Sequence, residues 1–194
     1  MKRIHRAPLA GAIIGLVTCA AHNAVAENYD YTNIGAGAAG QWKNPAEWLR
    51  TNGTTGDYPG DTTRRTDAAN VNQPANADYT VTLDSPLAGT LGVLTVGNPS
   101  GNAKATVVLA TPLNPVGDTV MQRNGRVVLD GVAMTGGALV FTNGGELVLD
   151  KGGSRVVTGT QLISNGNIGA VTALAMSAQS PAGSVTGRPR RFFC

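Results

Sequence analysis

Residues 143–150 read Asn-Gly-Gly-Glu-Leu-Val-Leu-Asp, a turn signal followed by a short apolar run and an aspartate. A similar stretch, Asn-Gly-Arg-Val-Val-Leu-Asp, occupies residues 124–130. Asn102 precedes the apolar run 105–109, and Asn165 is again followed by glycine, so these asparagines lie 22, 19 and 22 residues apart. A return of about 20 residues is typical of solenoids, in which each short coil stacks on the one before it.

Short runs that favour β-strands surround this repeat. Tyr79–Leu83 alternates apolar residues with threonine, as a half-buried strand does. β-branched residues dominate the runs, and Gly, Asn, Asp or Pro bound them. The predicted strands are 79–83, 91–97, 105–110, 126–129, 138–141, 146–149 and 155–158. Their spacing would also suit a β-sandwich, but the longer return favours an all-β chain folded as a parallel β-helix, or solenoid, of about four to five short coils.

In such a solenoid, each strand pairs in parallel with the equivalent strand one coil along, about 4.8 Å away. Inward Val, Leu and Phe side chains then stack in ladders, and Gly or Asn is expected at corners that need a positive φ. Asparagines at equivalent corners are expected to hydrogen-bond between coils. Within 91–97, alternation places Leu91 and Val93 on one face and Leu94 and Val96 on the other.

The N-terminus has the three parts of a secretory signal peptide. Basic residues lie within the first six positions, residues 9–18 are apolar, and residues 24–26 read Ala-Val-Ala. We therefore predict a signal peptide over 1–26, cut after Ala26, and a mature protein that is secreted or on the cell surface. A short buried helix and a lipoprotein signal ending at Cys19 are the alternatives; the apolar stretch is too short to cross a bilayer as a helix.

Removal of this segment changes the chemistry of the chain. The mature part has 12 basic and 12 acidic residues, no histidine, and Cys194 as its single cysteine. The balance argues against nucleic-acid binding. The missing histidine excludes Ser-His-Asp and Cys-His catalysis and histidine-based zinc sites. We expect no cofactor, no metal and no membrane span in the mature chain.

The remaining residues suit one domain. We predict a flexible lead-in over 27–40, a β-helix domain over 41–170 whose N-terminal cap is 41–76, and a tail over 171–194. The start of the tail is alanine-rich and would form a helix or a frayed last coil, and its end is basic and aromatic. That end suggests a truncated reading frame, or else a docking tail in which Cys194 forms an intermolecular disulfide.

Two tryptophans lie near the start of the mature chain. Because six residues separate Trp42 from Trp48, an extended chain would place both rings on one face, although Asn44-Pro45 favours a turn between them. One interpretation, which we favour, is that both rings cover the open end of the core, since terminal solenoid units need distinct capping structure. The other is a platform on which sugars stack.

Two aspartates occupy equivalent places in the repeat. Asp130 and Asp150 each follow an apolar strand and lie 20 residues apart, so stacked coils would bring them together, with Arg126, Lys151 or Arg155 nearby. Paired carboxylates act as acid and base in glycoside hydrolysis or bind calcium. The interpretation that we favour is simpler: each aspartate satisfies turn amides at a corner.

Residues 40–165 resemble the N-terminal part of bacterial autotransporter passenger domains and related secreted β-helix surface proteins. The resemblance rests on the tryptophan pair, Pro59-Gly60-Asp61, Asp67–Val71, Tyr79–Leu83, Leu91–Gly97 and the coil over 143–149. It implies an elongated right-handed parallel β-helix that serves as an adhesin or scaffold at the outer membrane.

We therefore expect a non-enzymatic, adhesin-like scaffold, perhaps better described as part of a truncated passenger, whose partners are surface glycans or proteins of host or neighbouring cells. The alternative is a β-helix that binds or cleaves polysaccharides through Asp130, Asp150, Arg126, Trp42 and Trp48. Open solenoid ends resemble sheet edges and favour self-association.

Overall fold

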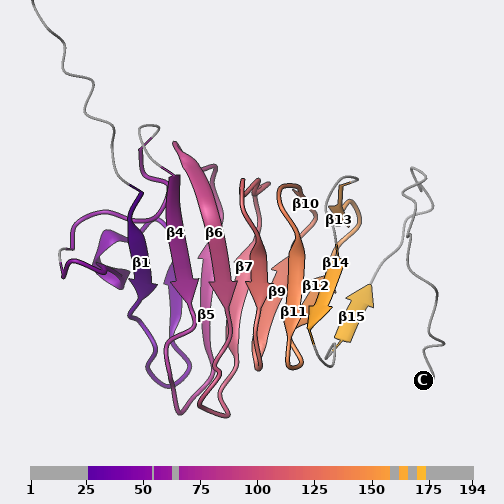
Figure 1. Cartoon of the computed structure of the whole chain (residues 1–194), viewed down its shortest axis with the longest axis horizontal. Coiled ribbons are helices and arrows are strands. Elements are labelled where there is room, and N and C mark those ends of the chain that lie inside the picture. The colour runs from indigo at the N-terminus through magenta and orange to yellow at the C-terminus, as the bar shows by residue number, and fades with distance from the viewer. Residues whose placement is uncertain (1–25, 54, 63–65, 158–161, 166–169, 174–194) are drawn as a thin grey trace, which may run out of the picture.

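The computed structural model describes residues 26–53, 55–62, 66–157, 162–165 and 170–173. These residues form parallel β-sheets and one short 3-10 turn, η1 (Pro45–Glu47), with no α-helix among them (Figure 1). The predicted signal peptide up to residue 25 and the tail from residue 174 lie outside the described residues.

The strands belong to two main sheets and one short sheet. The seven-stranded sheet contains, in spatial order, β14 (Leu162–Asn165), β11 (Leu139–Thr142), β8 (Thr119–Met121), β6 (Thr90–Val96), β4 (Thr66–Val71), β1 (Asn28–Tyr31) and β3 (Trp48–Arg50). The six-stranded sheet contains β15 (Ala170–Ala173), β12 (Glu146–Leu149), β9 (Gly125–Leu129), β7 (Ala105–Leu109), β5 (Tyr79–Leu83) and β2 (Ala39–Gln41). The two-stranded sheet pairs β10 (Ala133–Met134) with β13 (Arg155–Val156).

From β4 onward the chain alternates between the two main sheets, and we call each passage through both a circuit. Each strand pairs in parallel with the strand of the same sheet in the next circuit. Arg126 lies opposite Glu146, an offset of 20 residues that matches the sequence repeat, whereas Tyr79 lies opposite Ala105, an offset of 26. Parallel pairing between equivalent strands is confirmed, and the additional residues of the longer circuits lie in their loops.

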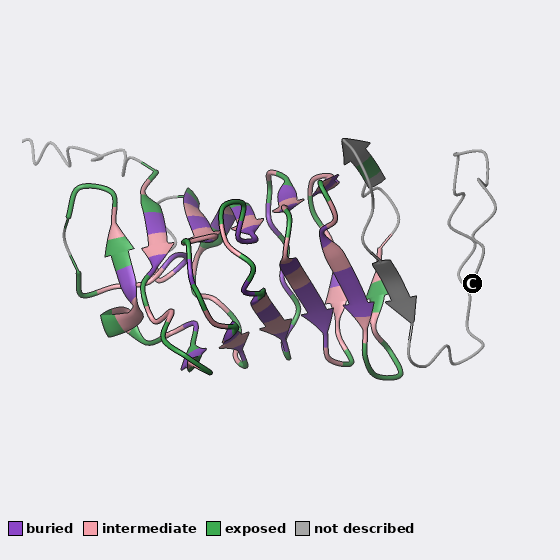
Figure 2. Cartoon of the chain, turned by 90° about the horizontal axis from the view of Figure 1, so that it is seen from below, coloured by how far each residue is buried: buried purple, intermediate pink, exposed green. Residues whose placement is uncertain are grey.

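The core lies between the main sheets and consists of side-chain ladders. Leu83, Leu109 and Leu129 occupy equivalent positions in three successive circuits, and each is fully buried. Figure 2 shows buried residues along the strands of both sheets and exposed residues on the connecting loops. Burial of one such side chain contributes about 1.5–3 kcal/mol, so the ladders supply much of the stability that a chain without internal disulfides needs.

The corners have the backbone geometry that their residues predict. Asn124 and Asn143 have φ of 58° and 56°, and Gly144 has φ of 96°, in the left-handed region that Gly and Asn adopt most readily. The Asn124 side-chain amide donates to the carbonyl of Gly101, one circuit back, at 2.8 Å. The expected hydrogen bonding between corners of successive circuits is therefore present here.

The N-terminal segment corrects one prediction. Residues 27–40 were expected to form a flexible lead-in, but β1 and β2 lie within or across this range, and each joins a main sheet. Tyr29 and Tyr31 are fully buried. Their i, i+2 spacing sends both rings into the core, and the antiparallel β3 covers the outer edge of β1. At the other end, β15 runs three residues past the predicted domain boundary at residue 170.

Strand β6 breaks the predicted alternation. The pairing of β4 with β6 shifts register between Asp67 and Ala69, so an additional residue of β6 is accommodated there. As a result Leu91, Leu94 and Val96 are all buried, while Val93 is 36% exposed. The prediction that Leu91 and Leu94 face opposite ways is wrong, because a bulge of this kind reverses the inward and outward positions beyond it.

Candidate functional site

The two tryptophans do not form a surface for sugars. Trp42 is 0% and Trp48 1% exposed, and their ring centroids lie 5.0 Å apart. Trp42 Nε1 donates to the carbonyl of Pro59 at 3.0 Å, and Trp48 Nε1 donates to the carbonyl of Trp42 at 2.6 Å. The stacking-platform hypothesis is wrong, because neither ring has a free face; both rings belong to the core at its N-terminal end.

A buried polar cluster holds this end together. Glu47 accepts hydrogen bonds from the hydroxyl of Tyr31 at 3.1 Å and from the backbone amide of Gln41 at 3.0 Å. Asn33 and Asn44 donate to its other carboxylate oxygen. Burial, followed by the Glu47 charge, raises the pKa of Tyr31. Glu47 therefore joins β1, β2 and η1, which is a structural role.

The structure brings Asp130 and Asp150 to equivalent corners, as predicted, because Leu129 lies opposite Leu149. Lys151 Nζ lies 2.6 Å from Asp130 Oδ1, and this hydrogen bond, together with the charges of Asp130 and Asp150, raises the pKa of Lys151. One ammonium thus lies among the two carboxylates. A carboxylate engaged in this way is a poor general base, and the pair offers no group that stays protonated to act as the acid.

The turn amides at this corner bind a residue that the sequence analysis did not single out. Ser154 Oγ accepts from the amide of Gly131 at 2.8 Å and from that of Lys151 at 3.3 Å, and it donates to the carbonyl of Leu129 at 2.6 Å. The expectation that the aspartates satisfy the corner amides is therefore wrong for these two amides. A serine in the next turn supplies the bonds across the circuits.

Arg126 lies elsewhere. It lies at the start of β9, whereas Asp130 follows the end of that strand, about 13 Å further along an extended chain. Arg126 Nε is 3.5 Å from Glu146 Oε2, and Lys104 Nζ is 3.6 Å from the same oxygen. The predicted residues thus separate into a buried aromatic pair, a corner ion pair and a ladder of charges on the outer face of the six-stranded sheet.

A groove of about 400 Å³ lies between the loops that follow β5 and β7, a volume within the range of small-molecule sites. We call it the Pro-Leu groove. Its lining contains no charged side chain and consists of Pro86, Leu87, Gly89, Thr90, Leu91, Thr111, Pro112, Leu113 and Asn114.

The groove has a sequence signal that becomes visible only with the register. Ser85-Pro86-Leu87 and Thr111-Pro112-Leu113 are 26 residues apart, the same offset that places Leu83 opposite Leu109. The two Pro-Leu loops are therefore equivalent parts of successive circuits, so they stack and leave the groove between them. Its hydroxyl and amide groups, beside proline and leucine, suit an uncharged ligand with polar and apolar sides.

No cluster of three or more His, Cys, Asp or Glu side chains that could hold a metal ion occurs in the part of the chain that the structure describes. Within that same part, no helix is long and apolar enough to cross a membrane. No protein-family model matches this chain, and neither a curated protein nor a solved structure does.

Proposed function

We propose that this chain is an exported, non-enzymatic scaffold of the right-handed parallel β-helix type, adhesin-like and related to autotransporter passengers. The alternation of the chain between two parallel sheets supports this architecture. Connections between parallel strands are right-handed in almost all proteins, which supports the handedness. The predicted signal peptide supports export to the cell surface or the medium.

One observation carries the non-enzymatic part of the proposal. The polar residues that a polysaccharide-cleaving site would need are engaged with one another, Asp130 with Lys151 and Arg126 with Glu146. The Pro-Leu groove, by contrast, has no ionisable side chain in its lining. A site without a titratable group supplies no acid or base, but its hydroxyls and apolar residues serve recognition.

A second candidate function, binding of neutral glycans, is favoured by the same groove. A sugar ring has hydroxyls at its edge and C–H groups on its faces. Thr90, Thr111 and Asn114 provide hydrogen-bonding groups, and Pro86 and Pro112 provide apolar surface. We propose the groove as the place where an adhesin of this kind binds surface glycans.

The experiment is a binding assay of the mature chain on immobilised neutral oligosaccharides and on whole cells. Thr90→Arg introduces a long charged side chain at an exposed position in the groove. Val116→Arg is the matched control, because Val116 is 66% exposed in the next circuit and does not line the groove. We expect Thr90→Arg to lose binding and Val116→Arg to keep it.

Three results would count against the proposal. Equal binding by both arginine variants would remove the groove as the site. Release of shortened sugars by the wild type, abolished by Asp130→Asn, would establish an enzyme at the corner. Retention of the full-length chain in the cytoplasm of the producing cell would contradict export.

A further inference from the structure

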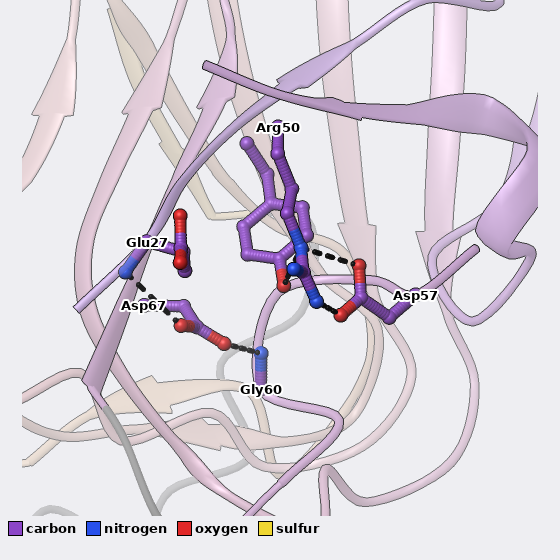
Figure 3. Close-up of polar contacts among 6 residues, drawn as sticks. Glu27, Arg50, Asp57, Gly60 and Asp67 are labelled. Atoms are coloured by element: carbon purple, nitrogen blue, oxygen red, sulfur yellow. Dashed lines mark hydrogen bonds and ion pairs between the residues drawn. The ribbon is translucent and has the colours of Figure 1, made fainter. Parts of the chain in front are cut away.

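The first residue after the predicted cleavage site contacts a buried carboxylate. The backbone nitrogen of Glu27 lies 3.4 Å from Asp67 Oδ1 (Figure 3). The carbonyl of Glu27 accepts from the amide of Ala68 at 2.8 Å. Both ends of this residue's backbone are thus held by two consecutive residues of β4, directly ahead of the β1–β4 pairing, which begins with Asn28 opposite Ala68.

Asp67 is in the core because of its position in β4. The inward residues of that strand are Asp67, Ala69 and Val71, and Asp67 is 0% exposed. Its Oδ2 accepts from the amide of Gly60 at 2.9 Å. Burial of a carboxylate is costly unless it is paired and hydrogen-bonded, so charge placed beside Asp67 has a large effect on the stability of this end.

We propose that cleavage after Ala26 turns the Glu27 nitrogen into an α-ammonium group that forms an ion pair with buried Asp67 and locks β1 into the fold. Cleavage hydrolyses the Ala26–Glu27 peptide bond: water supplies the hydroxyl that completes the Ala26 carboxylate, and the Glu27 nitrogen takes up the protons. The nitrogen is the same atom before and after cleavage, so the pair forms with no rearrangement of the chain. The inference rests on the proposed export.

The geometry gives both access and consequence. Ala26 is exposed, so the bond to be cut lies at the surface, while Asp67 is buried beneath it. An amide donor makes one neutral hydrogen bond, whereas an ammonium makes charge-assisted bonds, which are roughly twice as strong. Because β1 carries Tyr29 and Tyr31 into the core, an anchor at Glu27 stabilises the N-terminal end of the whole stack.

The test compares four proteins. Two begin at Glu27, released from a removable tag so that its amine is free, and two begin at Ala24 and so retain the peptide bond. Each pair contains the wild type and Asp67→Asn. We expect Asp67→Asn to lower the Tm of the chain that begins at Glu27 by at least about 3 °C more than that of the extended chain.

Amine reactivity provides the second readout. An ion pair favours the protonated amine, so an acylating reagent at neutral pH should modify the Glu27 amine roughly tenfold faster in Asp67→Asn than in the wild type. Peptide mass spectrometry measures this rate, with the exposed Lys104 of the same molecule as the internal control. If Asp67→Asn does not fold, the wild-type comparison still decides: the chain that begins at Glu27 must melt above the extended one.

Equal Tm values for the two wild-type chains, or equal acylation rates, would overturn the ion pair while leaving export intact. N-terminal sequencing of the exported protein separates the two proposals. A first residue other than Glu27 removes the premise of the ion pair but not export, and a chain that never leaves the cytoplasm contradicts the proposed function itself.

Discussion

Replacement of Trp48 by alanine removes the ring at the centre of the aromatic cluster that fills the N-terminal end of the core. The ring is 1% exposed, contacts Tyr31 edge-on at 5.2 Å between centroids, and lies 5.0 Å from Trp42. Truncation of a buried tryptophan to alanine costs about 3–5 kcal/mol. It also leaves the Trp42 carbonyl without its indole donor, which adds about 1–3 kcal/mol.

We therefore expect Trp48→Ala to lower the free energy of unfolding by about 4–6 kcal/mol, a large part of the 5–15 kcal/mol of a typical domain. Trp48→Phe keeps most of the ring and loses only the N–H donor, so its cost should be about 1–3 kcal/mol. Urea titration followed by far-UV circular dichroism measures both values. With two tryptophans in the chain, the fluorescence of Trp48→Phe reports Trp42 alone.

Leu49→Ala is the matched control, because the adjacent side chain is 37% exposed and should cost about 0.5 kcal/mol or less. A loss below about 1 kcal/mol for Trp48→Ala would refute the reasoning, since it would mean that the ring contributes no more than a surface residue. A shift of tryptophan emission on addition of oligosaccharide would return the rings to a binding role.

Two further predictions concern packing and pH. A Cβ at Gly125 would lie 2.2 Å from the carbonyl oxygen of Val96, so Gly125→Ala should cost about 1–3 kcal/mol or more; in thermal scans Gly152→Ala, with no atom near its Cβ, should melt like the wild type, and equal losses would argue against the stacked register. Burial raises the pKa of Tyr79 from 10.0 to about 12. The unfolded chain then loses this proton at lower pH than the folded one, so stability should be unaffected below pH 10 and fall by about 3 kcal/mol between pH 10 and 12. Urea midpoints at several pH values should show a shallower fall for Tyr79→Phe, and parallel curves would contradict the assignment.

Much of the strand pattern follows from local sequence. The strands predicted at 79–83 and 146–149 have these bounds in the structure, and the others that were predicted differ by one or two residues. These runs are rich in β-branched residues and end at Gly, Asn or Pro, which is a local property. Strand β8, with three residues, and β1, with alternating tyrosines, were missed because such short segments owe their conformation to their neighbours in the sheet.

The candidate site was less predictable. Equivalence of Asp130 and Asp150 follows from the repeat, but the identity of their partners does not, since Lys151 and Ser154 reach them across a corner. The Pro-Leu groove required the offset of 26 residues between β5 and β7, which differs from the repeat of the later circuits. Loop length varies between circuits, so a single period does not align all of them.

The sequence by itself determined that the chain is all-β, that its strands are short, and that asparagine and glycine mark the corners, because strand propensity and positive φ are properties of a few neighbouring residues. Tertiary structure alone decided which side chains meet. The bulge between β4 and β6 turned Leu94 into the core, the fold enclosed both tryptophans, and the pairing of β1 with β4 brought Glu27 to Asp67 across 40 residues of chain. Such contacts depend on register, which each strand acquires only from the strand beside it.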